Sequence, residues 1–353
     1  MSVGKPIRCL FYFFLLCGIA PGFAAEDYAV ADSVQPAQTG AQPVSPEPSF
    51  VRAFSSADDV KKTSHPILDR SVDIIAGPKD DEPRVDTLQS PAAITTDSNG
   101  RLFVADRGAK VIHVFDFARG KYSLLDRGQS VTPIALAVDN HDNLYATDEL
   151  SRTIFVYDPG GKFRRTLGKL GGDESYFESP AGIAVDNTTG NLYVCDMHRH
   201  MIIVLDKRGR LVAKAGKRGG GKLPGDFKLP TQAVIHDKEL FVLDAGNTRI
   251  QVFDTALHFR RAINLAYADG RSGLAVDDQG NIYVSDPVLD RIEVFARDGR
   301  RLYTFDLANV KAANLTQAAG LWISQGSCLY VVDAQKHFVD LFRISGQDAQ
   351  TCQ

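Results

Sequence analysis

One segment recurs six times along the chain, and this repetition limits the fold more than any other feature. The clearest copies cover residues 132–158, 179–206 and 272–295, each with three short apolar runs separated by turns. An aspartate closes the second run of every copy, at Asp106, Asp148, Asp196, Asp244, Asp286 and Asp333, at intervals of 42, 48, 48, 42 and 47 residues. A period in this range, built only of short apolar runs, is typical of β-propeller blades.

The third copy shows how one blade is composed. Alternation and turn residues predict strands over residues 182–185, 192–195, 202–205 and 211–215, with Gly190 in the first turn. One such sheet cannot shield both of its faces from water, so it must stack between two neighbours. The sequence therefore predicts an all-β fold, a six-bladed β-propeller of four-stranded antiparallel blades over residues 67–346.

The last copy lacks a fourth strand, which raises the question of how the ring closes. Its third strand is expected at residues 339–344, and the chain stops nine residues later. Residues 71–77 (SVDIIAG), before the first copy, read like the fourth strands at 163–168 and 211–216. We therefore expect residues 71–77 to complete the sixth blade, so that no sheet edge is left open.

The N-terminal residues have the pattern of an export signal. Lys5 and Arg8 precede an apolar stretch at residues 9–23, which small residues follow. This pattern predicts a signal peptide over residues 1–24. An uncleaved membrane anchor is the alternative, but about 15 apolar residues are few for a membrane span. Lipidation of Cys17 would be another link to the membrane, although bulky residues stand directly before it.

Composition divides the rest of the chain. Residues 25–66 are rich in Ala, Pro, Gln and Ser and predict a flexible tether, and residues 347–353 form a C-terminal tail. The formal charge is −3, and loss of Lys5 and Arg8 with the signal would lower it by two, to −5. This charge gives no reason to expect a nucleic-acid partner. We expect a monomer outside the cytoplasm, periplasmic or secreted.

Three cysteines follow the predicted signal. Cys195 falls in a strand, where we expect a small buried core residue. Cys328 opens a strand of the sixth copy and Cys352 follows its third strand, so a disulfide between them is an option in an oxidising compartment. The chain has no C-x-x-C pair, so neither a zinc finger nor a haem attachment site has support.

Several of these segments match a known repeat. Residues 180–186 (PAGIAVD), 191–196 (NLYVCD), 246–254 (GNTRIQVFD) and the glycine-rich spacer 171–180 make the chain resemble the NHL-repeat propellers, from about residue 71 to residue 344. The resemblance implies the six-bladed fold. It does not imply one activity, because similar propellers include ubiquitin-ligase scaffolds, RNA-binding domains, lyases and exported bacterial proteins.

The repeated aspartates invite a catalytic or calcium-binding interpretation, but a structural one is simpler. A carboxylate at the end of a strand can accept hydrogen bonds from the following backbone N–H groups and order the turn. Asp139, Asp186 and Asp277, at the ends of inner strands, suit turns in the same way.

Residues that depart from the repeat are better candidates for function. The resemblance implies that the loops after the second strands and the starts of the inner strands share one rim of the channel, and polar loop residues on a rigid scaffold are the usual form of a binding surface. The alternative is that they are ordinary solvated loop residues. The candidates for a ligand-binding rim are Arg107, Glu149, Arg152, Met197, His198, Arg199, His200, Gln232, Asn247, Arg271, Asp290, Lys336 and His337.

Catalysis has less support. The resemblance extends to amidating and streptogramin lyases, which use rim histidines, and His198, His200 and His337 are the candidates here. The first two belong to the third blade and the last to the sixth, and these blades face each other across a six-fold ring. A zinc ion needs three or four converging ligands, so we expect no metal site. The sequence also lacks a G-x-S-x-G elbow and a phosphate-binding loop.

The sequence therefore favours a non-catalytic binding scaffold without a cofactor, which holds a protein, peptide or glycan of the cell envelope on this rim. RNA binding would need a more basic rim, because Glu149 and Asp290 dilute its positive charge. The alternative function is a metal-dependent lyase or hydrolase centred on the same rim.

Overall fold

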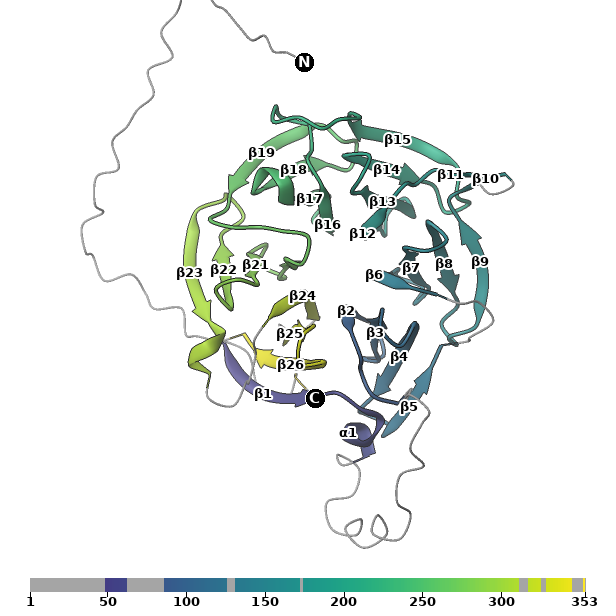
Figure 1. Ribbon diagram of the computed structural model, residues 1–353, viewed down its shortest axis with the longest axis vertical. Helices are drawn as coiled ribbons and strands as arrows, with labels where there is room; N and C mark the ends of the chain where they lie inside the picture. The colour runs from purple at the N-terminus through teal and green to yellow at the C-terminus, as the bar shows by residue number, and fades with distance from the viewer. Residues whose placement is uncertain are drawn as a thin grey trace, which may run out of the picture. The chain divides into compact units, whose positions relative to one another are not determined.

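The computed structural model describes residues 48–61, 86–125, 131–171, 174–310, 317–324, 328–344 and 352. Six four-stranded antiparallel sheets are arranged as blades around a central channel (Figure 1). This arrangement confirms the six-bladed propeller that the repeat predicts. The predicted signal peptide, Cys17 and residues 71–77 lie outside the described residues.

Each blade adds its strands from the channel outward. The innermost strands are β2 (Pro91–Thr96), β6 (Pro133–Val138), β12 (Pro180–Asp186), β16 (Pro230–His236), β20 (Leu274–Val276) and β24 (Ala318–Ser324). The second strands are β3 (Leu102–Asp106), β7 (Leu144–Asp148), β13 (Asn191–Asp196), β17 (Glu239–Asp244), β21 (Ile282–Asp286) and β25 (Cys328–Asp333).

The third and fourth strands form the outer half of each blade. The third strands are β4 (Val111–Asp116), β8 (Thr153–Tyr157), β14 (Met201–Leu205), β18 (Arg249–Asp254), β22 (Arg291–Phe295) and β26 (Phe338–Arg343). The fourth strands are β5 (Lys121–Leu124), β9 (Phe163–Leu167), β15 (Leu211–Gly216), β19 (Phe259–Asn264), β23 (Arg301–Asp306) and β1 (Ser49–Phe54). Short elements complete the described chain: α1 (Ala57–Lys61), the hairpin β10 (Lys169–Gly171) and β11 (Glu174–Ser175), and the 3-10 helices η1 (Ala245–Asn247) and η2 (Leu307–Asn309).

The hydrophobic core lies between the blades rather than inside any one of them. The cluster between the second and third blades, for example, joins Tyr145 and Val156 to Ile183 and Leu205. Five further clusters, each drawn from two neighbouring blades, complete the circle among the described residues. The stacking of sheets that cannot shield their own faces therefore explains why the ring closes.

The strand that closes the ring is not the one that the sequence suggests. β1 pairs with β26 in antiparallel register, from Ser49 opposite Arg343 to Phe54 opposite Val339. The assignment of residues 71–77 to this place was wrong, because β1 occupies it. The predicted tether at 25–66 and the propeller boundary at 67 need the same correction, since the sixth blade begins with residue 49.

β1 holds the first and last blades together through its side chains as well. Phe54 is buried, with its ring centroid 5.0 Å from that of Phe115 and 5.1 Å from that of Phe117 in and beside the first blade. The Arg52 guanidinium lies over the Phe117 ring, 3.7 Å from its centroid. A segment that joins β26 by hydrogen bonds and the first blade by aromatic packing can replace the fourth strand that the last repeat lacks.

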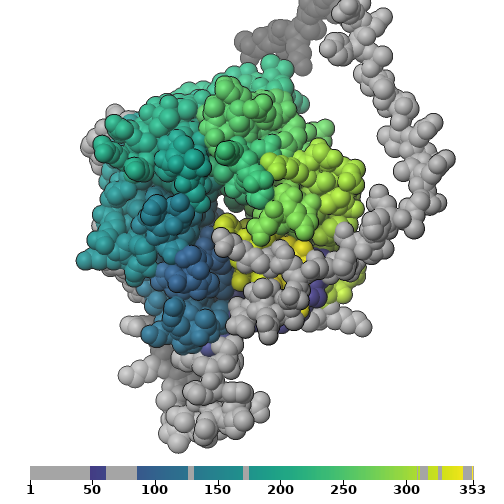
Figure 2. Space-filling view, turned by 180° about the vertical axis from the view of Figure 1, so that it is seen from behind, coloured from purple at the N-terminus to yellow at the C-terminus, as the bar shows by residue number. Residues whose placement is uncertain are grey.

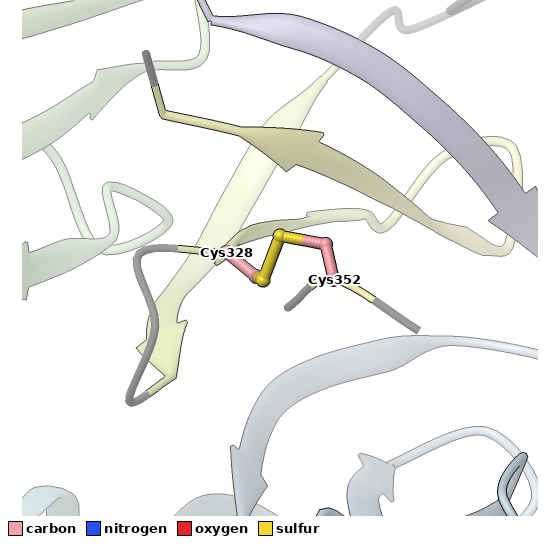
Figure 3. The surroundings of a disulfide bond; sticks show 2 residues. All are labelled: Cys328 and Cys352. Atoms are coloured by element: carbon pink, nitrogen blue, oxygen red, sulfur yellow. A yellow bond between two sulfur atoms is a disulfide. The ribbon is translucent and has the colours of Figure 1, made fainter. Parts of the chain in front are cut away.

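A disulfide holds the end of the chain against the last blade. Cys328, at the start of β25, is bonded to Cys352, and their Cα atoms are 5.6 Å apart (Figure 3). Both cysteines are buried in the cluster between the sixth and first blades. Cys195 is a free, buried cysteine of β13, as expected for a core residue, and its burial raises the pKa of the thiol.

Candidate functional site

One rim of the channel carries the turns that follow the second strands, and we call it the second-strand rim. Pro180 lies opposite Asp196 in the third blade, and Pro230 lies opposite Asp244 in the fourth. The starts of the inner strands and the ends of the second strands therefore lie at the same end of the ring. The candidate residues that follow the second strands all lie on this rim.

The aspartates at the ends of the second strands hold the rim together. Asp196 is fully buried and accepts hydrogen bonds from the backbone N–H groups of Glu178, Ser179 and Arg199, at 2.8, 3.1 and 3.2 Å. One carboxylate thus joins the linker before a blade's inner strand to the turn after its second strand. The sequence predicts that these aspartates order the following turn, and the structure agrees. The same carboxylate also binds the linker.

The first blade shows the electrostatic consequence of this arrangement. Burial disfavours the charged form of Asp106, but bonds with His113 and with the backbone N–H groups of Ala109, Gln89 and Ser90 outweigh it and lower the pKa of this carboxyl. The ionised Asp106 carboxylate already accepts hydrogen bonds from these donors. It is therefore poorly suited to bind an external cation.

The fourth residue after each of these aspartates adopts the left-handed backbone conformation. The six residues are Lys110, Arg152, His200, Thr248, Asp290 and His337, with φ between 47° and 64°. This conformation costs a non-glycine residue on the order of 1 kcal/mol. The turn requires the conformation in every blade, whereas the side chain differs from blade to blade.

Three candidate residues on the rim bond to the linkers before the inner strands. The Nδ1 atom of His200 accepts a hydrogen bond from the backbone N–H of Leu229, at 3.0 Å. Asn247 donates to the Gly221 carbonyl at 2.7 Å and to Asp244 at 2.8 Å. Arg199 is partly buried and donates to the backbone carbonyl of Tyr176. These side chains are therefore already engaged within the protein.

Other candidates are less available than the sequence suggests. Met197 packs against the core between the third and fourth blades, and Gln232 is half-buried on the channel wall. Arg271 is exposed but pairs with Asp269, at 2.5 Å. Burial and the charges of Asp333 and Asp286 raise the pKa of Asp290, against the effect of Lys336.

The remaining candidates present charge to solvent. Arg107 and Glu149 form an exposed ion pair across the first and second blades, with nitrogen and oxygen 2.7 Å apart. Arg152, His198 and His337 are exposed, and Lys336 is half-buried. The structure thus separates these solvent-facing groups from the side chains that hold the blades together.

Exposed apolar side chains on the same rim were missed by the sequence analysis. Leu150 is 71% exposed, Leu223 68%, Val288 56% and Leu289 57%. Within the described ranges, the other exposed large apolar side chains are Leu211, at 39%, and Val212, at 54%, on the outer strand β15. The repeat pattern gives no signal for these side chains, because they lie in turns and linkers, where polar residues are usual.

The channel itself is narrow and mostly apolar. Its cavity of about 190 Å³ is lined by the inner strands, with Leu136, Val185 and Leu321 on its wall and Asn187 and His236 near the opposite rim. Figure 2 shows the opening at the centre of the ring. In the described part of the chain, no three His, Cys, Asp or Glu side chains come together in a geometry that could hold a metal ion.

Comparison with known proteins shows what the chain is similar to. No protein-family model matches it. Peptidylglycine alpha-amidating monooxygenase of Rattus norvegicus is 31% identical over 134 residues, which cover 35% of this chain and 14% of that protein. NHL repeat-containing protein 3 of Mus musculus is 28% identical over 173 residues, 44% of this chain and 49% of that protein.

A solved structure of streptogramin B lyase has the same fold, with a TM-score of 0.55 and 13% identity over 73% of this chain and 94% of that one. The fold defines the chain as a six-bladed β-propeller. Its repeats and its NHL-repeat relatives make it an NHL-type propeller. The matched part spans less than half of the length of the curated relatives named here. Within the described residues, no helix is both long and apolar enough to cross a membrane.

Proposed function

We propose that this protein is a non-catalytic binding scaffold that holds a polypeptide partner on the second-strand rim. The observation that carries the proposal is the set of exposed apolar side chains, Leu150, Leu223, Val288 and Leu289, among exposed cations. On one rim, they offer a partner apolar area to bury together with charges to pair with.

The distribution of these side chains favours a large partner. Leu150 lies in the second blade, Leu223 in the linker between the third and fourth, and Leu289 in the fifth. A small molecule could contact one of these sectors, whereas a protein could bury all of them. Full burial of one leucine side chain contributes about 1.5–3 kcal/mol before the entropic costs of association.

Charge on the rim adds a preference for the partner's composition. Arg152 stands two residues after Leu150, and Lys222 stands directly before Leu223, and all four are exposed. A partner segment that alternates apolar and acidic residues would complement both features. Such charges act mainly on specificity and association rate.

The place of action that we propose is outside the cytoplasm. The Cys328–Cys352 disulfide supports this, because disulfides persist in oxidising compartments. The signal-like pattern of residues 1–24 points the same way.

The alternative function, a lyase or hydrolase on the same rim, is suggested by the similarity to an amidating enzyme. His198 and His337 would be its candidate groups, but they belong to blades on opposite sides of the ring (Figure 1). Metal analysis of the purified protein tests it, since stoichiometric zinc or calcium that is lost in His198→Ala or His337→Ala would favour catalysis.

The scaffold proposal is tested by affinity capture from the native envelope with the combined variant Leu150→Ser and Leu289→Ser. We expect this variant to lose the captured partner while its thermal midpoint stays close to that of the wild type. The matched control is Leu211→Ser with Val212→Ser on β15, which should keep the partner. Equal capture by both variants would count against this rim. Changes at Arg199 or His200 are less informative, because they also remove hydrogen bonds to the linkers before the inner strands.

A further inference from the structure

A polar pocket lies at the opposite rim, between the second and third blades, away from the surface discussed above. Its volume is about 260 Å³, and its lining includes Arg165 of β9, Lys207 of the turn after β14, Asn143, Asp139 and Thr188. A shallower hollow lined by Arg165, Lys207 and Arg208 adjoins it. The pocket therefore places two or three cations beside hydrogen-bonding side chains.

Contacts within the protein position the two cations of the pocket. Arg165 donates from Nη2 to the backbone carbonyl of Lys207, at 3.0 Å, and this bond joins the two blades. The aliphatic part of Lys207 packs over Gly190, where an added Cβ would lie 3.6 Å from the Cβ and Cδ atoms of Lys207. The two side chains therefore lie at one junction even though 42 residues separate them in the chain.

The same two positions carry cations at another junction of the ring. Arg261 lies opposite Val252 in the fourth blade as Arg165 lies opposite Val156 in the second. Arg297 stands two residues after the end of β22, as Lys207 stands two residues after the end of β14. The junction between the fourth and fifth blades is therefore the internal counterpart of the pocket.

A carboxylate lies between the two cations of that counterpart. Glu239 accepts from Arg261 at 2.5 and 3.1 Å and from Arg297 at 2.9 Å. These two arginines lower the pKa of Glu239, against the opposing effect of its burial. Arg297 also pairs with Asp237, at 2.9 Å.

The pocket lacks the carboxylate that joins the two cations of its counterpart. Glu239 directly precedes Leu240, which pairs with Phe253, and Asn143 directly precedes Leu144, which pairs with Tyr157. An uncharged amide thus stands where the other junction has a carboxylate. The pocket thus has a cation at both corresponding positions, but it has no carboxylate at the position of Glu239.

Asp139, the acidic residue of the pocket lining, is hydrogen-bonded to residues of its own turn and of the strand that follows. Asp139 accepts hydrogen bonds from the backbone N–H groups of His141 and Asn143, both at 2.9 Å, from the Asn143 amide at 2.9 Å, and from the Tyr145 hydroxyl at 3.0 Å. Its carboxylate is held by these donors rather than by Arg165 or Lys207. It reduces the positive charge of the pocket, but none of its hydrogen bonds is with either cation.

We propose that the pocket between the second and third blades binds the oxyanion of a small polar ligand, a carboxylate or a phosphate group, between Arg165 and Lys207. The anion takes the place that Glu239 has at the other junction. Arginine forms paired hydrogen bonds with both kinds of group, and a lysine ammonium adds a point charge. The amide and hydroxyl groups of the lining suit hydroxyl groups on the same ligand.

The test is an NMR titration with inorganic phosphate and with D-glucuronate, with D-glucose as the uncharged control. It is done at low ionic strength because salt shortens the range of exposed charges to about 10 Å at 0.1 M. Saturable shifts with phosphate alone would assign the site to phosphate esters, and tighter binding of glucuronate would assign it to acidic sugars. Either result supports the oxyanion site.

Three variants give the proposal its sharpest test. Arg165→Gln and Lys207→Gln should each weaken binding about tenfold, the factor expected for loss of one charge-assisted hydrogen bond. Asn143→Glu supplies an internal carboxylate as in the fourth blade, and it should block binding while the protein stays folded. Arg297→Gln is the matched control and should leave binding unchanged. The proposal is overturned if neither anion binds at millimolar concentration, or if Arg165→Gln and Asn143→Glu bind as the wild type does.

Discussion

Replacement of Asp340 by asparagine should stabilise the protein at neutral and alkaline pH. Asp340 lies in β26, its side chain is fully buried, and both carboxylate oxygens are without a hydrogen-bond partner in the described structure. Burial, together with the charge of Asp333, raises the pKa of this carboxyl to about 7, against the effect of Lys336. An amide removes the charge and can donate a hydrogen bond.

The magnitude follows from the difference between folded and unfolded states. The ordinary pKa is 3.8 and the raised one about 7, and at 1.36 kcal/mol per unit this corresponds to about 4 kcal/mol. Between pH 4 and pH 7 the folded protein keeps a proton that the unfolded chain has lost, so stability falls as the pH rises through this window. Below and above the window this contribution is constant.

Urea unfolding of the wild type and of Asp340→Asn between pH 4 and pH 8.5 measures the effect. The two proteins should have similar stability at the acid end, and the variant should become more stable by up to about 4 kcal/mol at the alkaline end. Asp278→Asn, at an exposed turn, is the control and should follow the wild type. Parallel curves for Asp340→Asn and the wild type would refute the reasoning.

Two further predictions concern the closure and packing of the ring. Cys352→Ser should lower the free energy of unfolding by about 3–4 kcal/mol, because the bond closes a loop across a separation of 24 residues; a wild type that unfolds identically with and without reductant would contradict this. Gly182→Ala should cost about 1–3 kcal/mol, since its Cβ would lie 2.5 Å from the Cα of Gln232 and 2.6 Å from the carbonyl oxygen of Thr231 in the next blade. Gly270→Ala, where an added Cβ meets no atom within 4 Å, is its control in thermal denaturation, and equal midpoints for the two variants would show that the backbones are not in close contact.

The blades could be predicted because their inner three strands repeat a strong signal. The aspartate that closes each second strand needs a fixed register to reach its linker and turn, so its spacing follows the blades. Fourth strands have no such residue, and they are half-exposed, as β9 and β15 show. Residues 71–77 therefore resembled fourth strands by pattern alone. The ring is closed by β1, and its anchoring residues Arg52 and Phe54 do not belong to the repeated pattern.

The sequence predicted where the candidate residues lie better than it predicted which contacts they make. The resemblance put the turns on one rim, but it could not show that His200 accepts from the Leu229 backbone or that Asn247 bonds to Gly221. Such contacts depend on how neighbouring blades dock. The proposed oxyanion pocket could not be predicted from the sequence for the same reason, because Arg165 and Lys207 come together only at the junction of two blades.

Hydrogen exchange of the native protein, followed residue by residue, tests most directly how the ring is closed. The backbone amides of β1 that face β26 should exchange as slowly as those of the fourth strands β9, β15 and β19. Rapid exchange throughout residues 49–54, with protection at residues 71–77 instead, would contradict closure by β1.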